Sequence, residues 1–373
     1  MRAMVLTGGG ARGAYQAGVL KAVSEISGTW EKKNPFEIVT GVSAGSINAT
    51  FWASQCHDPV RGAEKLLDLW QNVKFSDVFQ SDVISMGNVG AKFALDFMMA
   101  PLRGSHFAKA LMNTKPLHHL LQSHIDYDQI QKNLDAEHLR ALSVTATDYT
   151  SSNSITFVQG KAPMEMWDRQ LRKSEDTKIR VEHVLGSCAI PIFFPPVNID
   201  GRYFGDGCLR NTAPLSPAIH LGAEKLFIVG VRKQPPTSEI LTTNVDRPSV
   251  GRVISVVLNA ILLDGVDWDI ERMNRVNKTL SHVPEEKRKS LSLRPVNFIW
   301  ISPSEDIGKM AQGETWRLPR VIRYLLKGLG PLEQASGLIS YLLFDPTFCS
   351  RLAELGYKDA MVRKTEIEDF LAS

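Results

Sequence analysis

The chain has 373 residues, 43% hydrophobic and 22% charged, so it is long enough to bury a large core. Its 43 lysines and arginines against 40 aspartates and glutamates give a net charge of +3, which does not indicate a nucleic-acid-binding protein. The 4 cysteines are widely spaced and form no C-x-x-C pair, which argues against a disulfide framework and a zinc site.

The N-terminus leaves no room for a signal peptide before a glycine-rich loop that begins at Gly8. The longest apolar stretch, 253–263, is about half the ~20 residues that a membrane-spanning helix needs. We therefore expect a cytoplasmic protein. Peripheral association with a membrane and delivery as an effector are both compatible with that expectation.

The first elements alternate between short apolar strands and helical patterns. Met4–Leu6 is predicted to be a strand, Ala14–Val23 a helix and Phe36–Thr40 a second strand, after which the small-residue run Gly41–Ala49 begins. This order with short connections predicts an α/β fold with a parallel-rich central sheet flanked by helices.

Residues 76–125 interrupt this alternation, because glycines and a proline are interspersed among the apolar residues there. We expect a helical insertion in this segment, with a lid as one role for it. Beyond the insertion, the pattern predicts strands at 142–147, 154–158 and 225–231 and helices at 181–189 and 216–221.

The last part of the chain is more helical. Its pattern predicts helices at 250–277, 316–327 and 348–371 and a strand at 296–301. We expect one domain at 1–231 and a mainly helical extension at 232–373 that packs on it.

A G-x-S-x-G pattern, Gly41-Val42-Ser43-Ala44-Gly45, follows the second predicted strand. Glycines on either side make room for a serine on a tight strand-to-helix turn, and the helix N-terminus offers N–H groups to a developing oxyanion. Ser43 is therefore the candidate nucleophile, with Gly41 and Gly45 forming the elbow around it. The alternative is a small-residue turn without a catalytic role.

A second glycine-rich turn, Gly8-Gly9-Gly10-Ala11-Arg12-Gly13, follows the first predicted strand. Glycines let the backbone approach a ligand closely and aim N–H groups at a negative oxygen. Adjacent parallel strands would bring this turn beside Ser43 at the same sheet edge. We therefore predict that the residues Gly8, Gly9, Gly10, Ala11, Arg12 and Gly13 form an oxyanion hole.

The same glycines match the dinucleotide fingerprint G-x-G-x-x-G. That fold needs an acidic residue at the end of its second strand, whereas the second strand here ends at Thr40. The turn is not a P-loop either, because Ala14 and Tyr15 follow Gly13 in place of Lys and Ser or Thr. Nucleotide binding is thus disfavoured, and we expect neither a cofactor nor a metal.

Two kinds of base could activate the serine. Among the nine histidines, only His282 fits the order of an α/β-hydrolase triad well, and it lies in a polar segment. Asp206 in Gly205-Asp206-Gly207 is the better candidate, because a lone carboxylate can act as a base in a dry site. The alternative for Asp206 is a solvated Asp-Gly turn.

Together, Gly8–Gly13, Gly41–Gly45 and Asp206-Gly207 resemble the patatin-like phospholipase family. The segments 186–196 and 211–214 are also similar to that family, so the resemblance covers about residues 3–231. It implies a three-layer α/β/α fold and a Ser43–Asp206 dyad without histidine. The tail more loosely resembles the helical extension of bacterial members.

One residue departs from the family pattern, and another matches it at a charged position. Cys208 stands where the family commonly has a second glycine, and a positive φ there would cost on the order of 1 kcal/mol. Arg12 matches the family's basic position. It could form a salt bridge on a helix face, or it could fix the loop or meet a phosphate.

We therefore expect a serine acyl hydrolase that cleaves fatty-acyl esters of phospholipids or other lipids. A soluble esterase or thioesterase for small acyl donors and a non-catalytic lipid-binding regulator remain alternatives. A lipid substrate requires contact with a membrane or micelle, for which 316–329 is a candidate basic amphipathic helix and 93–102 an alternative surface. A helix packed on the core with a solvated basic face would give the same pattern at 316–329. The sequence leaves the headgroup, acyl position and oligomeric state open.

Overall fold

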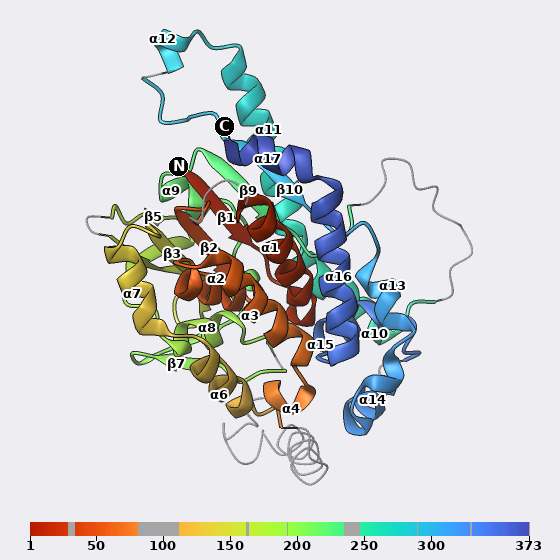
Figure 1. Ribbon diagram of the computed structural model, residues 1–373. Coiled ribbons are helices and arrows are strands. Elements are labelled where there is room, and N and C mark those ends of the chain that lie inside the picture. Colours follow the sequence, from red (N-terminus) through yellow and green to blue (C-terminus); the bar gives the residue numbers. More distant parts are fainter. Residues whose placement is uncertain are drawn as a thin grey trace.

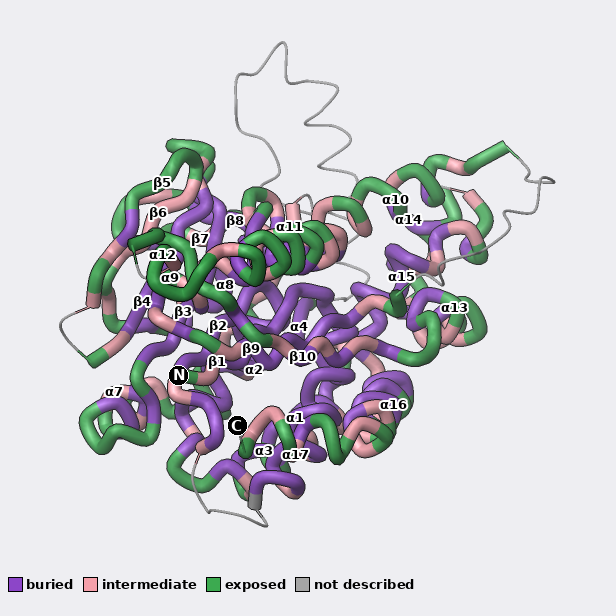
Figure 2. Tube along the Cα trace, turned by 90° about the horizontal axis from the view of Figure 1, so that it is seen from above, coloured by how far each residue is buried: buried purple, intermediate pink, exposed green. Residues whose placement is uncertain are grey.

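A 10-stranded sheet between two layers of helices forms the body of the protein in the computed structural model (Figure 1). Seen from above, the strands lie between one helical layer that includes α1 and α16 and another that includes α11 (Figure 2). The structure describes residues 1–28, 34–80, 112–161, 164–191, 193–234, 247–288, 290–328 and 330–372.

Parallel strands make up the centre of the sheet. In spatial order these are β10 (Asn297–Ile301), β9 (Lys225–Val229), β1 (Arg2–Leu6), β2 (Ile38–Val42) and β3 (Ala141–Asp148). Most of their residues are buried, as expected for parallel strands that are covered by helices on both faces.

The sheet becomes mixed beyond β3. The remaining strands are β4 (Ser154–Gly160), β5 (Asp168–Arg169), β6 (Arg172–Asp176), β7 (Val197–Ile199) and β8 (Arg202–Gly205). Strands β4 and β8 both pair antiparallel with β3, and Thr147 lies opposite Gly205. Because of this pairing, Asp206, which follows Gly205, lies at the end of β3. The predicted α/β class with a parallel-rich sheet is confirmed.

One helical layer includes α1 (Gly13–Gly28), α2 (Ala44–Gln55), α3 (Pro59–Asn72) and α16 (Pro346–Val362). Helices α1 and α16 lie side by side (Figure 1) and touch through glycines. A Cβ at Gly18 would lie 1.8 Å from the Ala353 carbonyl oxygen, and one at Gly356 would lie 2.0 Å from that of Tyr15. The C-terminal part of the chain is therefore packed tightly against the first helix.

The opposite layer contains α9 (Ser216–His220) and α11 (Asp264–Ser281). Its apolar side chains, such as Ile270, form a second core with β-strand residues such as Val5 and Ile228. The remaining helices of the described residues are α4 (Phe75–Val78), α6 (Lys115–His124), α7 (Tyr127–Asp135), α8 (Val181–Ser187), α10 (Val250–Leu262), α12 (Glu285–Arg288), α13 (Ile307–Gln312), α14 (Arg320–Lys327), α15 (Ser336–Leu342) and α17 (Lys364–Ala372), with the short 3₁₀ turns η1 (Gly10–Arg12), η2 (Gly207–Leu209) and η3 (Thr315–Arg317).

The single helix predicted at 250–277 is wrong, because α10 and α11 break at Leu263, which has φ −121° and ψ −37°. Asp264 opens α11, where a carboxylate suits the positive end of the helix, and pairs with Arg232. The helix predicted at 348–371 likewise divides into α16 and α17 at Arg363, with φ −102° and ψ 22°.

Smaller differences follow from local chemistry. The second strand begins at Ile38 rather than Phe36 and extends to Val42. The helix predicted at 316–327 is α14, which begins at Arg320, directly after Pro319, and the 3₁₀ turn η3 precedes it. Proline removes an N–H donor and excludes the preceding residue from the helical region, so the helix begins after it.

The predicted insertion at 76–125 is described at its two ends, by α4 and α6, whereas 81–111, including the candidate surface 93–102, lies outside the described residues. Strand β10 belongs to the predicted extension and yet pairs with β9 in the sheet. The division at residue 231 stays a prediction. No helix of the described ranges is long and apolar enough to cross a bilayer.

Candidate active site

Ser43 lies on the turn between β2 and α2, in a backbone conformation that is rare for a residue with a Cβ. Its φ is 52° and its ψ is −130°, which stores strain at this position. A Cβ at Gly41 would lie 2.4 Å from the Gly45 carbonyl oxygen, and a Cβ at Gly45 would lie 2.1 Å from that of Leu6. The tight turn therefore requires both glycines.

Several side chains hold this strained turn in place. The Ser43 N–H donates to Ser187 Oγ at 2.8 Å, and Ser187 Oγ donates to the Thr145 carbonyl at 2.6 Å. The Ser43 carbonyl accepts from Ser46 Oγ at 2.6 Å and from Cys188 Sγ at 3.1 Å. Sequence reasoning assigned no role to these supporting residues. The sequence gives one indication of their importance, because Ser187 and Cys188 lie in the segment 186–196 that is similar to the patatin-like family.

Asp206 faces Ser43 from the end of β8, where it opens η2. Ser43 Oγ donates to Asp206 Oδ2 at 2.7 Å, and the Cys208 N–H donates to Asp206 Oδ1 at 2.9 Å. The main chain of Asp206 is held by its N–H to the Ala189 carbonyl at 2.9 Å and by Thr147 Oγ, which donates to its carbonyl at 2.8 Å. Both carboxylate oxygens are thus fixed.

Asp206 is completely buried. Burial raises the pKa of this carboxyl to about 6, while hydrogen bonds from Ser43 and Cys208 act in the opposite direction. A base with a pKa near the working pH is both ionised and able to accept a proton, so Asp206 is suited to general-base chemistry.

None of the histidines in the described ranges is hydrogen-bonded to Ser43 or Asp206. His183 is buried, but its Nδ1 accepts from the Arg180 N–H, and burial lowers its pKa to about 4. His282 is exposed at the end of α11. His106 lies outside the described residues. Among the described residues, the Asp206 carboxylate is therefore the candidate base that lies within hydrogen-bond distance of the serine.

The glycine-rich loop lies beside Ser43 because β1 and β2 are parallel neighbours. A Cβ at Gly8 would lie 3.0 Å from Ser43 Cβ. Within the loop, the Arg12 N–H donates to the Gly9 carbonyl at 3.2 Å, and the Gly13 N–H is turned to the carbonyls of Gly10 and Ala11. These bonds leave the N–H groups of Gly8, Gly9, Gly10 and Ala11 as the candidate oxyanion donors of the loop.

Cys208 causes no backbone strain. It lies in the 3₁₀ turn η2 and is not among the described residues with positive φ. Its side chain occupies the space beside the first loop glycine, since a Cβ at Gly8 would lie 2.5 Å from Cys208 Sγ. The cost anticipated for a positive φ does not arise.

Next to Ser43 lies a small, mainly apolar pocket of about 20 Å³. This volume is about enough for one water molecule, so apolar side chains must move aside before a larger group can enter. The pocket is lined by Gly10, Ser43, Ala44, Ile47, Trp70, Val78, Leu117, Cys188, Ile190, Phe194 and Phe344.

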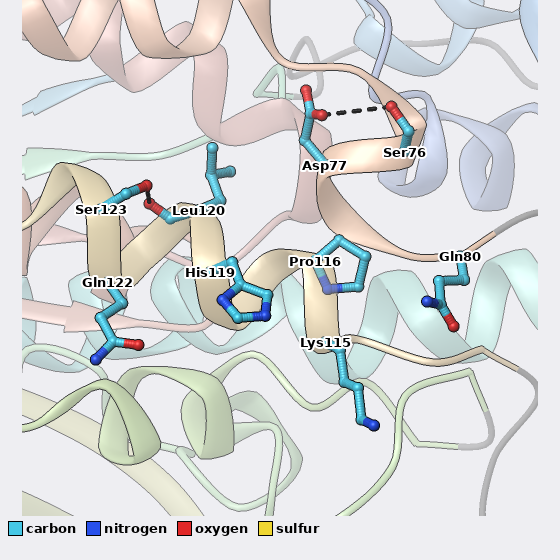
Figure 3. A pocket seen from close by; sticks show the side chains of 9 residues that line it. All are labelled: Ser76, Asp77, Gln80, Lys115, Pro116, His119, Leu120, Gln122 and Ser123. Atoms are coloured by element: carbon cyan, nitrogen blue, oxygen red, sulfur yellow. Dashed lines mark hydrogen bonds between the residues drawn. The ribbon is translucent and has the colours of Figure 1, made fainter.

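A larger cavity of about 670 Å³ lies between α4 and α6, where Asp77, Lys115 and His119 are among the polar side chains of its wall (Figure 3). The residues that line it include neither Ser43 nor Asp206. It is therefore separate from the candidate site. The described residues contain no cluster of His, Cys, Asp and Glu that could hold a metal ion.

The sequence model of the patatin-like phospholipase family matches residues 4–219, which contain the glycine loop, Ser43 and Asp206. The chain belongs to this family. The family is described as phospholipase-like, which makes lipid acyl hydrolysis the activity to test.

The crystal structure of VipD from Legionella pneumophila is similar to this chain at 16% identity, with a TM-score of 0.37. The alignment covers 99% of this chain and 66% of that one, so the chain spans slightly less than two thirds of the VipD chain. No curated protein sequence matches the chain.

Proposed function

We propose that the protein cleaves fatty-acyl esters of lipids, with Ser43 as nucleophile and Asp206 as its base. The observation that carries this proposal is the 2.7 Å hydrogen bond from Ser43 Oγ to the carboxylate of Asp206, both of which are buried. The family supplies the reaction class, and the raised pKa of Asp206 suits its role.

In this mechanism Asp206 accepts the Ser43 proton as Oγ attacks the ester carbonyl. The N–H groups of Gly9, Gly10 and Ala11, with that of Ala44, stabilise the tetrahedral oxyanion. Its collapse expels the alcohol, which takes the proton from Asp206, and leaves an acyl group on Ser43. Water activated by Asp206 then releases the fatty acid.

The walls of the pocket support an acyl chain as the group bound beside Ser43. Ile47, Val78 and Phe194 offer apolar surface to a hydrocarbon chain. They offer no charged partner to a polar acid. A substrate that brings a long acyl chain gains more from opening this pocket than a short one does, because burial of each CH₂ contributes roughly 0.8 kcal/mol.

The test is release of fatty acid from mixed phospholipid vesicles in the presence of a chelator, by wild type, Ser43→Ala and Asp206→Asn. We expect activity in wild type and a loss of at least about 10³-fold in both variants. The matched controls, Ser290→Ala and Asp168→Asn, remove an exposed hydroxyl and an exposed carboxylate and should leave the rate unchanged. Full activity in Ser43→Ala would refute the mechanism.

The same assay separates the alternatives. Turnover of a short-chain nitrophenyl ester without any release from vesicles would favour an esterase or thioesterase for small acyl donors. No turnover of either substrate, with vesicle binding retained, would favour a non-catalytic lipid-binding regulator.

A lipid substrate also requires a surface that meets the bilayer, and we propose the neighbouring helices α10 and α14 (Figure 1, Figure 2). Trp316 and Tyr324 are 61% and 77% exposed, and Val253 on α10 is 51% exposed. Exposed apolar and aromatic side chains beside the basic residues Arg320 and Lys327 suit an anionic lipid interface.

The structure refines which basic residues to test. Arg317 is held in ion pairs with Glu314 and Asp345, whereas Arg320 and Lys327 are exposed. Replacing both with Glu should weaken binding to anionic vesicles by about tenfold or more. Unchanged binding would discard this surface.

The control for that experiment is the double variant Arg275→Glu with Lys278→Glu, which makes the same charge change on the exposed face of α11. We expect its binding to anionic vesicles to stay close to that of wild type.

A further inference from the structure

The glycine loop beside Ser43 is in contact with a part of the chain that lies outside the family-matched segment. Gly10 has φ +57°, and a Cβ there would lie 2.3 Å from the main-chain carbonyl oxygen of Tyr341 in α15. The backbone of α15 therefore lies directly against the central residue of the loop. A residue with a side chain at position 10 would displace either one.

Arg12, on the same loop, is buried without a carboxylate partner among the ion pairs of the described ranges. Its Nε donates to Ser340 Oγ at 2.9 Å, and its Nη1 donates to the Val231 carbonyl at 3.4 Å. Its guanidinium carbon lies 4.4 Å from the centre of the Tyr341 ring. A buried cation is unfavourable unless negative charge density lies near it, and the face of an aromatic ring offers such density.

The hydroxyl end of Tyr341 is also held, by a hydrogen bond. Its hydroxyl donates to Asn259 Oδ1 on α10 at 2.7 Å, and the residue is 1% exposed. A second bond joins the same two helices, from the Leu338 N–H to Ser255 Oγ at 3.3 Å. The ring cannot turn away from Arg12 without breaking its contact with α10.

We propose that Tyr341 is a positioning residue for the oxyanion loop. The Tyr341 ring holds the guanidinium of Arg12 in place, and the Tyr341 carbonyl sets the position of Gly10. The hydroxyl of Tyr341 ties this residue to α10. This inference rests on the proposed function, because it assigns the loop the role of stabilising the oxyanion. It adds that the loop's geometry depends on the C-terminal part of the chain.

Two substitutions separate the contributions of the ring and the hydroxyl. Tyr341→Leu removes the aromatic face over Arg12, whereas Tyr341→Phe keeps that face and removes the bond to Asn259. Removal of one oxyanion donor typically lowers kcat by about 10²–10³-fold, so displacement of the loop should have a smaller effect. We expect kcat to fall by about 10–100-fold in Tyr341→Leu and by less than about fivefold in Tyr341→Phe, with KM changed little in both.

The measurements use a soluble nitrophenyl ester and an organophosphonate, which forms a tetrahedral adduct on a nucleophilic serine. The phosphonate reports on the oxyanion loop, because its oxygen occupies the position of the oxyanion. Its second-order inactivation rate should fall in Tyr341→Leu in parallel with kcat. Rates are normalised to the amount of enzyme that the phosphonate titrates, so partial unfolding does not count as slower chemistry.

Tyr357 provides the matched control, because its hydroxyl donates to Glu25 Oε2 at 2.7 Å on the outer side of the α1–α16 pair. Tyr357→Leu and Tyr357→Phe make the same chemical changes away from the loop and should leave kcat unchanged. If Tyr341→Leu fails to fold, Asn259→Ala removes the hydroxyl's acceptor instead and should lower kcat about as much as Tyr341→Phe does.

Different results would overturn different claims. Mass spectrometry first establishes whether the phosphonate labels Ser43 in wild type, and absence of labelling would refute the proposed function together with this inference. Labelling at equal rates in wild type and Tyr341→Leu, with equal kcat, would refute the inference alone. Equal losses in the Tyr341 and Tyr357 variants would also refute it, because they would indicate a general effect on packing.

Discussion

The segment up to residue 231 buries many polar side chains, whereas the segment from 247 to 372 exposes many large apolar ones. Nearly all of the buried polar side chains of the described residues lie in the first segment, and Ser255, Asp269 and Ser340 are the exceptions. Most of the exposed large apolar side chains lie in the second segment, four of them valines on α10. Figure 2 shows that α10 and α11 carry many exposed residues.

This difference has a physical consequence. Buried polar groups are stable only when each has a partner, so they specify a rigid arrangement such as the one around Ser43. Exposed apolar groups gain free energy when a further surface covers them. The first segment therefore specifies a rigid arrangement around Ser43, whereas the second exposes apolar surface. Tyr341 is one of the places where the two segments meet.

The largest effect should come from a single methyl group in the first segment. In Gly45→Ala the new Cβ would lie 2.1 Å from the Leu6 carbonyl oxygen, which belongs to a central strand and cannot move away cheaply. We expect at least about 4 kcal/mol of destabilisation or failure to fold. In the second segment, Gly313→Ala meets nothing within 4 Å and should be neutral or slightly stabilising. Equal urea midpoints for both variants would contradict this close packing of Gly45 against Leu6.

The next largest effect is an increase in the free energy of unfolding. Because burial raises the folded-state pKa of Asp206 to about 6, ionisation of this group weakens the folded state as the pH rises from about 4 to 6. Asp206→Asn removes that loss, so the variant should be inactive and more stable than wild type by roughly 3 kcal/mol at pH 8.

The gain should disappear below about pH 4, where wild-type Asp206 is protonated in both the folded and unfolded states. Urea unfolding at pH 4 and pH 8 measures it. The exposed control Asp168→Asn should show no comparable gain. A stability difference between Asp206→Asn and wild type that does not change with pH would contradict the assignment of a buried, ionising carboxylate.

How much of this site could be predicted depends on how far apart its partners lie in the sequence. Ser43 and Asp206 stand in short glycine-bracketed motifs whose geometry is local, and the order of the first strands is enough to place the loop beside the serine. Tyr341 lies far along the chain from Gly10 and has no motif, so only the folded structure brings it to the loop. The helix break at Leu263 likewise coincides with a long-range partner, Arg232, which pairs with Asp264.

A smaller effect concerns the pH dependence of catalysis. Activity should fall about tenfold for each pH unit below 6, because kcat/KM follows ionisation of the free enzyme's base. A hydrogen bond from the Cys208 side chain lowers the pKa of Asp206, so Cys208→Ala should move the inflection to higher pH. Cys349→Ala removes a buried thiol from α16 in the second segment and should not move it. An inflection that is the same in all three proteins would exclude this role for Cys208.

The smallest effect should be the same in both segments. Asp58 caps α3 by accepting from the Arg61 N–H, and Asp306 caps α13 by accepting from the N–H groups of Gly308 and Lys309. Both caps are exposed and satisfy donors at the first turn of a helix, so Asp→Ala at either should cost about 1 kcal/mol of unfolding free energy. Chemical denaturation of the two variants checks this. Equal losses of unfolding free energy would mean that helix capping contributes alike in the two segments. The difference between the segments would then lie in long-range packing and burial. A much larger loss at Asp306 would instead mean that the second segment depends on its helix caps for stability.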